Sequence, residues 1–406
     1  MGGWARGPDR SVSRRLLLAG GAAAALGAVA GCQSAGATQD AGRAEAGSTL
    51  LPKVKVPPKA ELAITPKHKA TDIGLDEPIQ VNASGGRLRN VVVQDDGGSP
   101  IDGDFDEKRQ TWRSKGSQLM PDRRYVVRAE AANEDGKITK SEARFATAPP
   151  SEVVGTDITP LDGQEVGVGM PIVVTFSQPV SDRAAAQQRL VVETSQQVEG
   201  AWHWFSDSEV HYRPKEYWPA NTDVTVQLNY KDFQYGKNAW GVKNKTRKFR
   251  IGRSVVTQVD LKTAFTANVY VDGEVTRTIP VTGGKKDWET RNGIKLVLER
   301  RTDINFVNEA IGAEEDYDLM APYGLRVTWS GEFLHTADWS LSNLGKRNAS
   351  HGCVGMNKSN SKWMYEISKV GDPVEFVTTG AQMPVTGNGF GDWNMSWSEW
   401  KAGSAV

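Results

Sequence analysis

Cysteine is scarce in this chain: only Cys32 and Cys353 occur among 406 residues. Two thiols so far apart do not form a disulfide framework, so each needs its own explanation. Neither sign of charge is in excess, because 49 Lys and Arg residues balance 49 Asp and Glu residues. Since no long basic run occurs either, the composition argues against a nucleic-acid partner.

Motifs for metals and phosphates are also missing. The chain has no Cys-x-x-Cys, no His-Glu-x-x-His and no glycine-rich phosphate loop. Zinc held by His335, His351 and Cys353 is the main alternative chemistry, but a structural site needs a fourth ligand. The chain's other histidines fall in other predicted domains: His68, His203 and His211. We therefore expect no metal and no cofactor.

The N-terminus has the pattern of an export signal. An apolar stretch from Leu16 to Val29 follows Arg14-Arg15 and is too short to span a membrane as a helix. Val29-Ala30-Gly31-Cys32 resembles a lipobox, so we expect residues 1–31 to be a lipoprotein signal peptide and Cys32 to carry lipid. The mature protein is then expected outside the cytoplasm, anchored to the outer face of the cytoplasmic membrane. Ser13–Leu18 resembles a twin-arginine signal, and general secretion stays open as an alternative.

The rest of the chain predicts an all-β protein of several domains. Residues 32–60 are rich in Ala, Gly, Ser, Thr and Pro, as in a flexible linker. Short alternating segments such as Ile172–Phe176, with the hairpin turn signals Asp135-Gly136 and Asp272-Gly273, then predict strands throughout. The expected boundaries are 61–149 and 150–250 for two accessory domains, 251–376 for a catalytic domain and 377–406 for a C-terminal extension.

The two accessory segments look like a repeat. Ile64-Thr65-Pro66 matches Ile158-Thr159-Pro160, and Pro78 matches Pro171 within similar apolar runs. The offsets are 94 residues (64 to 158) and 93 residues (78 to 171). This period suits one immunoglobulin-like sandwich for each segment.

Ser350-His351-Gly352-Cys353, with His335 upstream, predicts a cysteine acyl-transfer site. A neighbouring imidazole can take the proton of a thiol and stabilise the thiolate. His335 is the better base, because His351 shares a tight turn with the nucleophile. Gly352 lets the backbone bend so that the amide of Cys353 can face a developing oxyanion.

These residues resemble the signature of the L,D-transpeptidases with a YkuD-type catalytic domain, in which a histidine precedes Ser-His-Gly-Cys at similar spacing. Pro280–Gly284 and Thr290–Gly293 are similar to an early strand and turn of that family. One departure is Gly355, where the family commonly has Arg or Asn. The resemblance implies immunoglobulin-like accessory domains, followed by a YkuD-type β-sandwich catalytic domain.

The resemblance also implies roles for individual residues. Cys353 is the expected nucleophile and His335 the general base, with Thr336 orienting the imidazole through its backbone. His351 and Gly352 are expected to shape the loop and the oxyanion region. The positions expected to contact substrate are Tyr317, Ser330, Gly331 and Asn357.

Two further segments have predicted roles. The acidic, glycine-containing stretch 309–324, with Tyr317 and Tyr323, predicts a mobile loop over a cleft. Trp393, Trp397 and Trp400 have the spacing of one helix face, which predicts a Trp-rich helical extension docked on the catalytic domain. Core packing or a domain interface is expected, rather than glycan binding, for the tryptophans of the second accessory domain: Trp202, Trp204, Trp218 and Trp240.

The predicted function is a lipid-anchored L,D-transpeptidase within the cell wall. By resemblance, Cys353 attacks a peptidoglycan tetrapeptide stem, releases D-alanine and passes the acyl group to a second stem, giving a 3→3 cross-link. Carbapenem-type inhibitors are expected to acylate the same thiol. Two alternatives remain: a carboxypeptidase that uses water as acceptor, and a wall-binding lipoprotein without activity.

Overall fold

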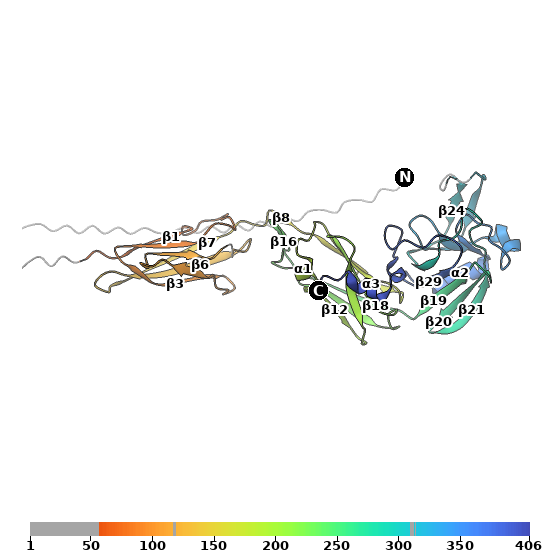
Figure 1. Ribbon diagram of the computed structural model, residues 1–406, viewed down its shortest axis with the longest axis horizontal. Coiled ribbons are helices and arrows are strands. Elements are labelled where there is room, and N and C mark those ends of the chain that lie inside the picture. The colour runs from red at the N-terminus through yellow and green to blue at the C-terminus, as the bar shows by residue number, and fades with distance from the viewer. Residues whose placement is uncertain (1–56, 117–118, 309–311, 313) are drawn as a thin grey trace, which may run out of the picture. The chain divides into compact units, whose positions relative to one another are not determined.

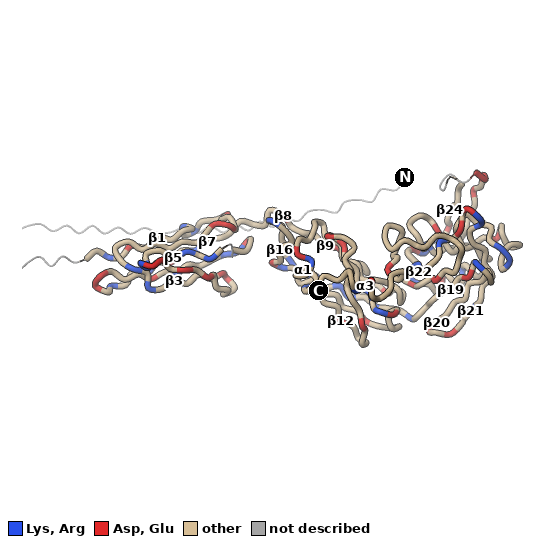
Figure 2. The backbone as a smooth tube through the Cα atoms, viewed as in Figure 1, with Lys and Arg blue, Asp and Glu red and all other residues tan. Residues whose placement is uncertain are grey.

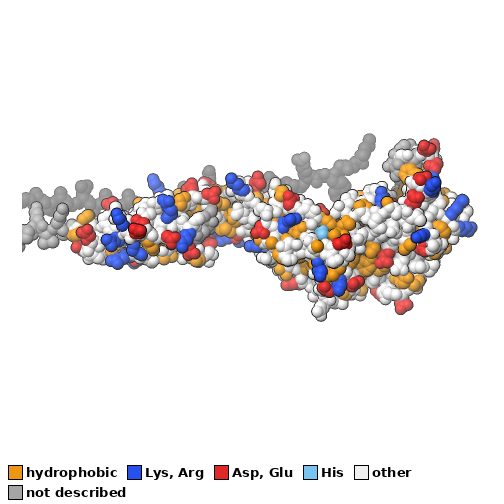
Figure 3. Space-filling view, in the orientation of Figure 1, with side chains coloured by type: hydrophobic (Ala, Val, Ile, Leu, Met, Phe, Trp, Pro, Cys, Tyr) orange, Lys and Arg blue, Asp and Glu red, His pale blue; other side chains and the backbone are white. Residues whose placement is uncertain are grey.

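The computed structural model describes residues 57–116, 119–308, 312 and 314–406. The predicted signal peptide and Cys32 lie outside these residues. Strands dominate the described chain (Figure 1), as the short alternating segments predicted. Lys and Arg are interspersed with Asp and Glu along the described backbone (Figure 2), and the face shown in Figure 3 mixes both signs with apolar side chains.

The first domain is a sandwich of two sheets, with strand orders β1-β2-β5-β4 and β3-β6-β7. Alternating side chains, among them Val81, Val127 and Phe145, point into its core. The turn predicted at Asp135-Gly136 joins β6 to β7. The strands are β1 (Glu61–Thr65), β2 (Gln80–Ser84), β3 (Arg87–Asp95), β4 (Gly103–Phe105), β5 (Thr111–Ser114), β6 (Arg124–Ala132) and β7 (Ile138–Ala146).

The second domain is a sandwich with strand orders β10-β18-β15-β12 and β13-β14-β11-β9, beside a small sheet β16-β17-β8. Its elements are β8 (Glu152–Val153), β9 (Thr156–Thr159), β10 (Glu165–Val166), β11 (Ile172–Phe176), α1 (Arg183–Gln187), β12 (Leu190–Thr194), β13 (Gly200–Trp204), β14 (Glu209–Pro214), β15 (Asp223–Leu228), β16 (Gln234–Gly236), β17 (Ala239–Trp240) and β18 (Lys245–Ile251). Ile64 pairs with Val81 in the first domain and Ile158 with Val174 in the second, so the matching segments pair alike.

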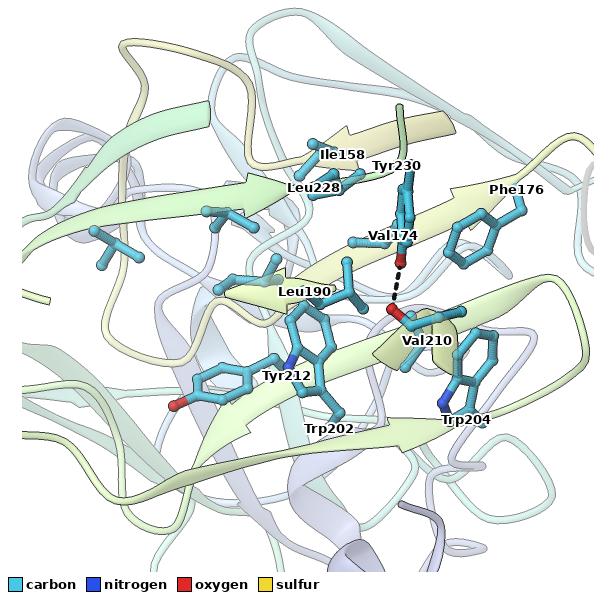
Figure 4. Packing of buried hydrophobic residues seen from close by; sticks show 14 of the residues in the cluster. Ile158, Val174, Phe176, Leu190, Trp202, Trp204, Val210, Tyr212, Leu228 and Tyr230 are labelled. Carbon is cyan, nitrogen blue, oxygen red and sulfur yellow. Dashed lines mark hydrogen bonds between the residues drawn. The ribbon is translucent and has the colours of Figure 1, made fainter. Parts of the chain in front are cut away.

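Aromatic side chains fill the second core (Figure 4). Phe176 stacks on Trp204 at 5.8 Å between ring centroids, and the Tyr230 hydroxyl donates to the carbonyl of Ala186 at 3.0 Å. The prediction that the tryptophans of this domain pack inside is confirmed, because all four are buried: Trp202, Trp204, Trp218 and Trp240.

The third domain combines a five-stranded sheet, β21-β20-β19-β29-β22, with a four-stranded sheet, β23-β26-β27-β28, and a hairpin, β24-β25. Its elements are β19 (Val255–Asp260), β20 (Thr266–Val271), β21 (Glu274–Pro280), β22 (Gly293–Leu296), β23 (Glu299–Arg301), β24 (Ile304–Val307), β25 (Asp318–Ala321), β26 (Gly324–Arg326), β27 (Phe333–Thr336), η2 (Asp338–Asn343), β28 (Val354–Met356), α2 (Lys358–Ile367) and β29 (Pro373–Val377). The turn predicted at Asp272-Gly273 joins β20 to β21.

The C-terminal extension corrects one prediction. Trp393 lies in a separate short helix, η3 (Asp392–Asn394), so the three tryptophans do not form one helix face. The extension contacts both domains: η3 packs on β22 of the catalytic domain, as predicted for the extension, whereas the final helix α3 (Trp397–Ala402) packs on β13 of the second domain. There the Trp400 indole donates to the carbonyl of Ala201 at 2.9 Å, and its ring stacks on His203.

Arg213 of β14 explains the tryptophan spacing. Its guanidinium lies 4.6 Å from the ring centroids of Trp393 and Trp400 and 5.4 Å from that of Trp397. An arginine held between aromatic faces gains cation–π attraction while burying apolar area. The three rings therefore gather around one cation of the second domain, which periodicity alone does not reveal.

Main-chain contacts also join the second domain to the third. The amides of Gly167 and Gly169 donate to the carbonyls of Val370 and Gly371 at 2.8 and 2.9 Å. A side chain at Gly167 would meet the backbone of Asp372, so this approach requires glycine.

We predict that Trp400→Ala destabilises the second domain. The side chain is 0% exposed, and truncating a buried tryptophan costs about 3 to 5 kcal/mol. Calorimetry of the full chain should show a lower transition temperature for that domain. Trp329→Ala is the matched control: its ring is half exposed, so the change should be about 0.5 kcal/mol or less. Equal effects of the two substitutions would contradict the docking seen here.

Candidate active site

The pairing of two neighbouring parallel strands brings His335 and Cys353 together. Leu334 pairs with Val354 and His335 with Gly355, so β27 and β28 run side by side in the same direction. Cys353 directly precedes β28, and His335 is the third residue of β27. Both line one cleft of about 910 Å³.

His335 is arranged to accept a proton. Its Nδ1 lies 2.7 Å from the carbonyl oxygen of Thr336, so Nδ1 carries the hydrogen and Nε2 keeps its lone pair. Phe306 and Trp339 lie against the ring at 4.5 and 5.8 Å between centroids. Burial lowers the pKa of His335 to about 4, so the imidazole is neutral near pH 7. Thr336 thus contacts the imidazole through its backbone.

The Cys353 thiol is protonated at rest. Burial raises its pKa to about 12, although a main-chain hydrogen bond from Phe333 favours the thiolate. The sulfur lies 3.5 Å from the carbonyl oxygen of Gly331, to which the thiol donates. A neutral thiol beside a neutral imidazole requires the proton to move as the sulfur attacks.

Hydrogen bonds fix the loop that carries the nucleophile. Ser350 Oγ donates to the carbonyl of Cys353 at 2.6 Å, and the hydroxyl of Thr290 donates to the carbonyl of Gly352 at 2.8 Å. Gly352 has φ +119°, a conformation that side chains disfavour. The Thr290 motif found in the sequence therefore supports the nucleophile loop directly.

His351 contacts the edge of the cleft. Its Nε2 lies 2.9 Å from a carboxylate oxygen of Glu315, and its ring lies 5.5 Å from Tyr317 and 5.1 Å from Trp288. Hydrogen bonds from Lys285 and His351 lower the pKa of Glu315 to about 2. These contacts connect the catalytic loop to the residues around Tyr317, so His351 has a structural part here.

The predicted loop over 309–324 needs correction. Residues 309–311 and 313 lie outside the described part, but Asp318–Ala321 forms β25, which pairs with β24. Tyr317 lines the cleft as expected. Tyr323 instead packs on Tyr365 at 5.6 Å, and its carbonyl accepts the amide of Thr336. The segment is a hairpin because Leu319 and Ala321 bury one face of it.

The other predicted positions divide into two groups. Ser330 and Gly331 line the cleft. Asn357 is not among the residues that line it; its side chain accepts from the amide of Asn360 at 2.9 Å and caps α2. Asn357 thus caps a helix, and a substrate contact there stays a prediction. At Gly355, a Cβ would meet Ala337 and Thr282, so the packing leaves no room for a side chain.

Several residues of the site were not predicted from the sequence. Trp288, Phe306 and Trp339 line the cleft, and their isolated positions in the sequence give no signal of this. Beneath the loop, Lys295 and Glu332 form a buried ion pair at 2.8 Å. The apolar residues around Lys295 predict a strand, but a strand pattern does not identify a distant charged partner.

Two structural features are absent from the part of the chain that the structure describes. No group of three or more His, Cys, Asp or Glu side chains there could hold a metal ion. Among the same residues, no helix has the length and apolar character needed to cross a membrane.

Comparison with known proteins agrees with this architecture. Residues 254–376 match the L,D-transpeptidase catalytic domain, and residues 70–234 match the bacterial Ig domain. L,D-transpeptidase 2 of Mycobacterium tuberculosis (strain CDC 1551 / Oshkosh) is 34% identical over 353 residues, which cover 86% of this chain and 85% of that protein. The chain therefore belongs to the L,D-transpeptidase family.

A second relative and a solved structure are also similar to this chain. L,D-transpeptidase 5 of M. tuberculosis (strain ATCC 25618 / H37Rv) is 30% identical over 365 residues, covering 88% of this chain and 80% of that protein. A solved structure of the LD transpeptidase LdtMt1 in complex with imipenem is 33% identical, with a TM-score of 0.48; the match covers 56% of this chain and 100% of that one.

We predict that Gly352→Ala slows L,D-transpeptidase activity by about tenfold or more, because a side chain at this φ costs about 1 to 3 kcal/mol and displaces the loop. The control is Gly273→Ala in the β20–β21 turn, where φ is +88° and nothing lies within 4 Å of the added Cβ. It carries a similar backbone cost away from the cleft. Assays of both purified variants should separate them; similar rates would contradict this account of the loop.

Proposed function

We propose that this protein forms 3→3 cross-links in peptidoglycan through an acyl-enzyme on Cys353. The observation that carries the proposal is the orientation of His335: its Nδ1–H is engaged by the Thr336 carbonyl, which leaves Nε2 free to accept the thiol proton. Family membership supports the reaction class. The cleft that both residues line is large enough for a peptide stem.

The first half-reaction releases D-alanine. As the Cys353 sulfur attacks the carbonyl that precedes the terminal D-alanine of a tetrapeptide stem, His335 takes the thiol proton. The amide of Cys353, turned by Gly352, donates to the oxyanion. Collapse of the tetrahedral intermediate breaks the peptide bond, and His335 passes its proton to the departing amine.

The second half-reaction forms the new bond. A diaminopimelate side-chain amine of another stem attacks the thioester, and His335 accepts its proton. The thiolate leaves and is reprotonated, which restores the neutral pair. Water in place of the amine would give carboxypeptidase activity, so the acceptor decides between the two enzymatic alternatives. The same thiol is the expected target of carbapenem-type β-lactams, whose ring opening leaves an acyl group on sulfur.

Mass spectrometry of stem peptides incubated with the purified protein tests this proposal. With an amine acceptor present, we expect a cross-linked dimer and free D-alanine; Cys353→Ala should yield neither. His335→Ala should slow the reaction by about 10² or more, the usual contribution of a general base. Carbapenem adducts should form on the wild type and not on Cys353→Ala.

The products that form distinguish the transpeptidase from the carboxypeptidase and from an inactive lipoprotein. Shortened stems without any dimer would favour the carboxypeptidase. Absence of both product and carbapenem adduct in a folded protein would favour an inactive wall-binding lipoprotein. Turnover by Cys353→Ala at the wild-type rate would reject the nucleophile.

We also propose that the protein is a lipoprotein on the outer face of the cytoplasmic membrane, anchored through Cys32 within the cell wall. The support is the sequence Val29-Ala30-Gly31-Cys32 after an apolar stretch. Metabolic labelling with a fatty-acid analogue should mark the wild type and spare Cys32→Ala. Cys353→Ala, which removes the other thiol, is the control and should still be labelled. Label in Cys32→Ala would contradict the anchor.

A further inference from the structure

A fully enclosed lysine lies beneath the nucleophile loop. Lys295, on β22, is 0% exposed, with Nζ 2.8 Å from a carboxylate oxygen of Glu332 and 3.9 Å from the ring centroid of Phe376. Burial lowers the pKa of its ammonium group to about 8, and the Glu332 carboxylate opposes this shift. Burying an ion in a core costs several kcal/mol unless it is paired well. Lys295 thus depends on Glu332 to remain charged.

Glu332 connects this lysine to the nucleophile. It lies between Gly331, whose carbonyl accepts from the thiol, and Phe333, whose backbone donates to the sulfur. Its carboxylate also accepts from the backbone amide of Arg291 at 3.0 Å and from the Arg291 guanidinium at 3.2 Å. Fixing the Glu332 side chain therefore fixes the two flanking peptide groups that touch the sulfur.

The charges of the pair act on the sulfur in opposite directions. The Glu332 carboxylate, in the turn before β27, disfavours the thiolate, and the Lys295 ammonium on β22 favours it. His335 on β27, which also lines the cleft, is neutral at rest, and His351 and Arg291 each contact a carboxylate, that of Glu315 and that of Glu332. The other titratable and charged side chains that line the cleft are Asp287, Glu289, Arg301, Tyr317 and Arg326.

We propose that Lys295 and Glu332 are a positioning pair for the nucleophile. Lys295 holds Glu332 so that the Gly331 and Phe333 peptide groups cradle the sulfur, and its positive charge offsets the carboxylate when the thiolate forms. This rests on the proposed function only in taking Cys353 as the nucleophile. Neither residue touches substrate in this account; both act through the sulfur.

The test measures alkylation of Cys353 by iodoacetamide from pH 6 to 10 in the purified full chain, followed by mass spectrometry of the peptide that contains Cys353. In Lys295→Met, Glu332 keeps its contacts with Arg291 but loses the charge of Lys295. Below about pH 8, where Lys295 is charged in the wild type, this should move the rate profile about one pH unit higher. At a fixed pH in that range, alkylation is then about tenfold slower. Lys295→Met/Glu332→Gln removes both charges and should restore the rate to within about threefold of the wild type.

Arg213→Met is the matched control, because it removes a buried cation from the second domain. It should lower the melting temperature and leave the alkylation profile unchanged. A wild-type profile in Lys295→Met would overturn the proposal, and so would a slow double variant. If Lys295→Met does not fold, Glu332→Gln alone carries the test: its profile should move to lower pH, and a shift upward or no shift overturns the pair.

This experiment is independent of peptidoglycan turnover. Alkylation reports on the thiol whether or not the protein cross-links stems. If the proposed function is wrong, the cross-linked dimer and free D-alanine will be missing, but Lys295→Met will still slow the alkylation of Cys353. Failure of the pair would appear as unchanged alkylation in an enzyme that still forms dimers.

Discussion

The parallel pairing of β27 with β28 is the constraint on which the site depends. A parallel neighbour cannot follow through a tight turn, so the chain must leave the sheet and return. Residues 337–353 make that return, and they reach β28 through Ser350–Cys353. The register then places the imidazole and the sulfur in the same cleft. Thr290 and Ser350 hold the returning loop, and a displacement there would separate base and nucleophile without removing either.

Around His335 and Cys353, charged side chains lie farther from the reacting atoms than neutral ones do. The groups that exchange the proton are neutral at rest and lie against aromatic rings, where a lasting charge would be costly. Full charges are placed one layer away, in Lys295 with Glu332 and in Glu315 with its partners. The reaction therefore creates charge on the imidazole and the reacting atoms only transiently. The permanently charged side chains around them are already held by their partners. Such preorganisation limits the rearrangement needed as the bond forms.

Local features of this fold were predictable, and partners across the fold were not. Alternation predicted strands such as Ile172–Phe176, and Asp272-Gly273 predicted a hairpin turn, because both signals act between near neighbours in sequence. The signature around Cys353 located the site for the same reason. Periodicity shows that a tryptophan is buried but not against what, so the docking of Trp400 on the second domain was mispredicted. The helix cap at Asn357 was not predicted either, since capping depends on where α2 begins.

The C-terminal helix links the end of the chain to a domain made much earlier. His203 and Ala201 bond to Trp400, which lies 197 and 199 residues farther along. During synthesis from the N-terminus, β13 and its aromatic surface stay uncovered until α3 emerges. Contacts this far apart in sequence slow folding and prolong exposure of apolar surface. The second domain thus reaches its final state only after the third domain and α3 have been made.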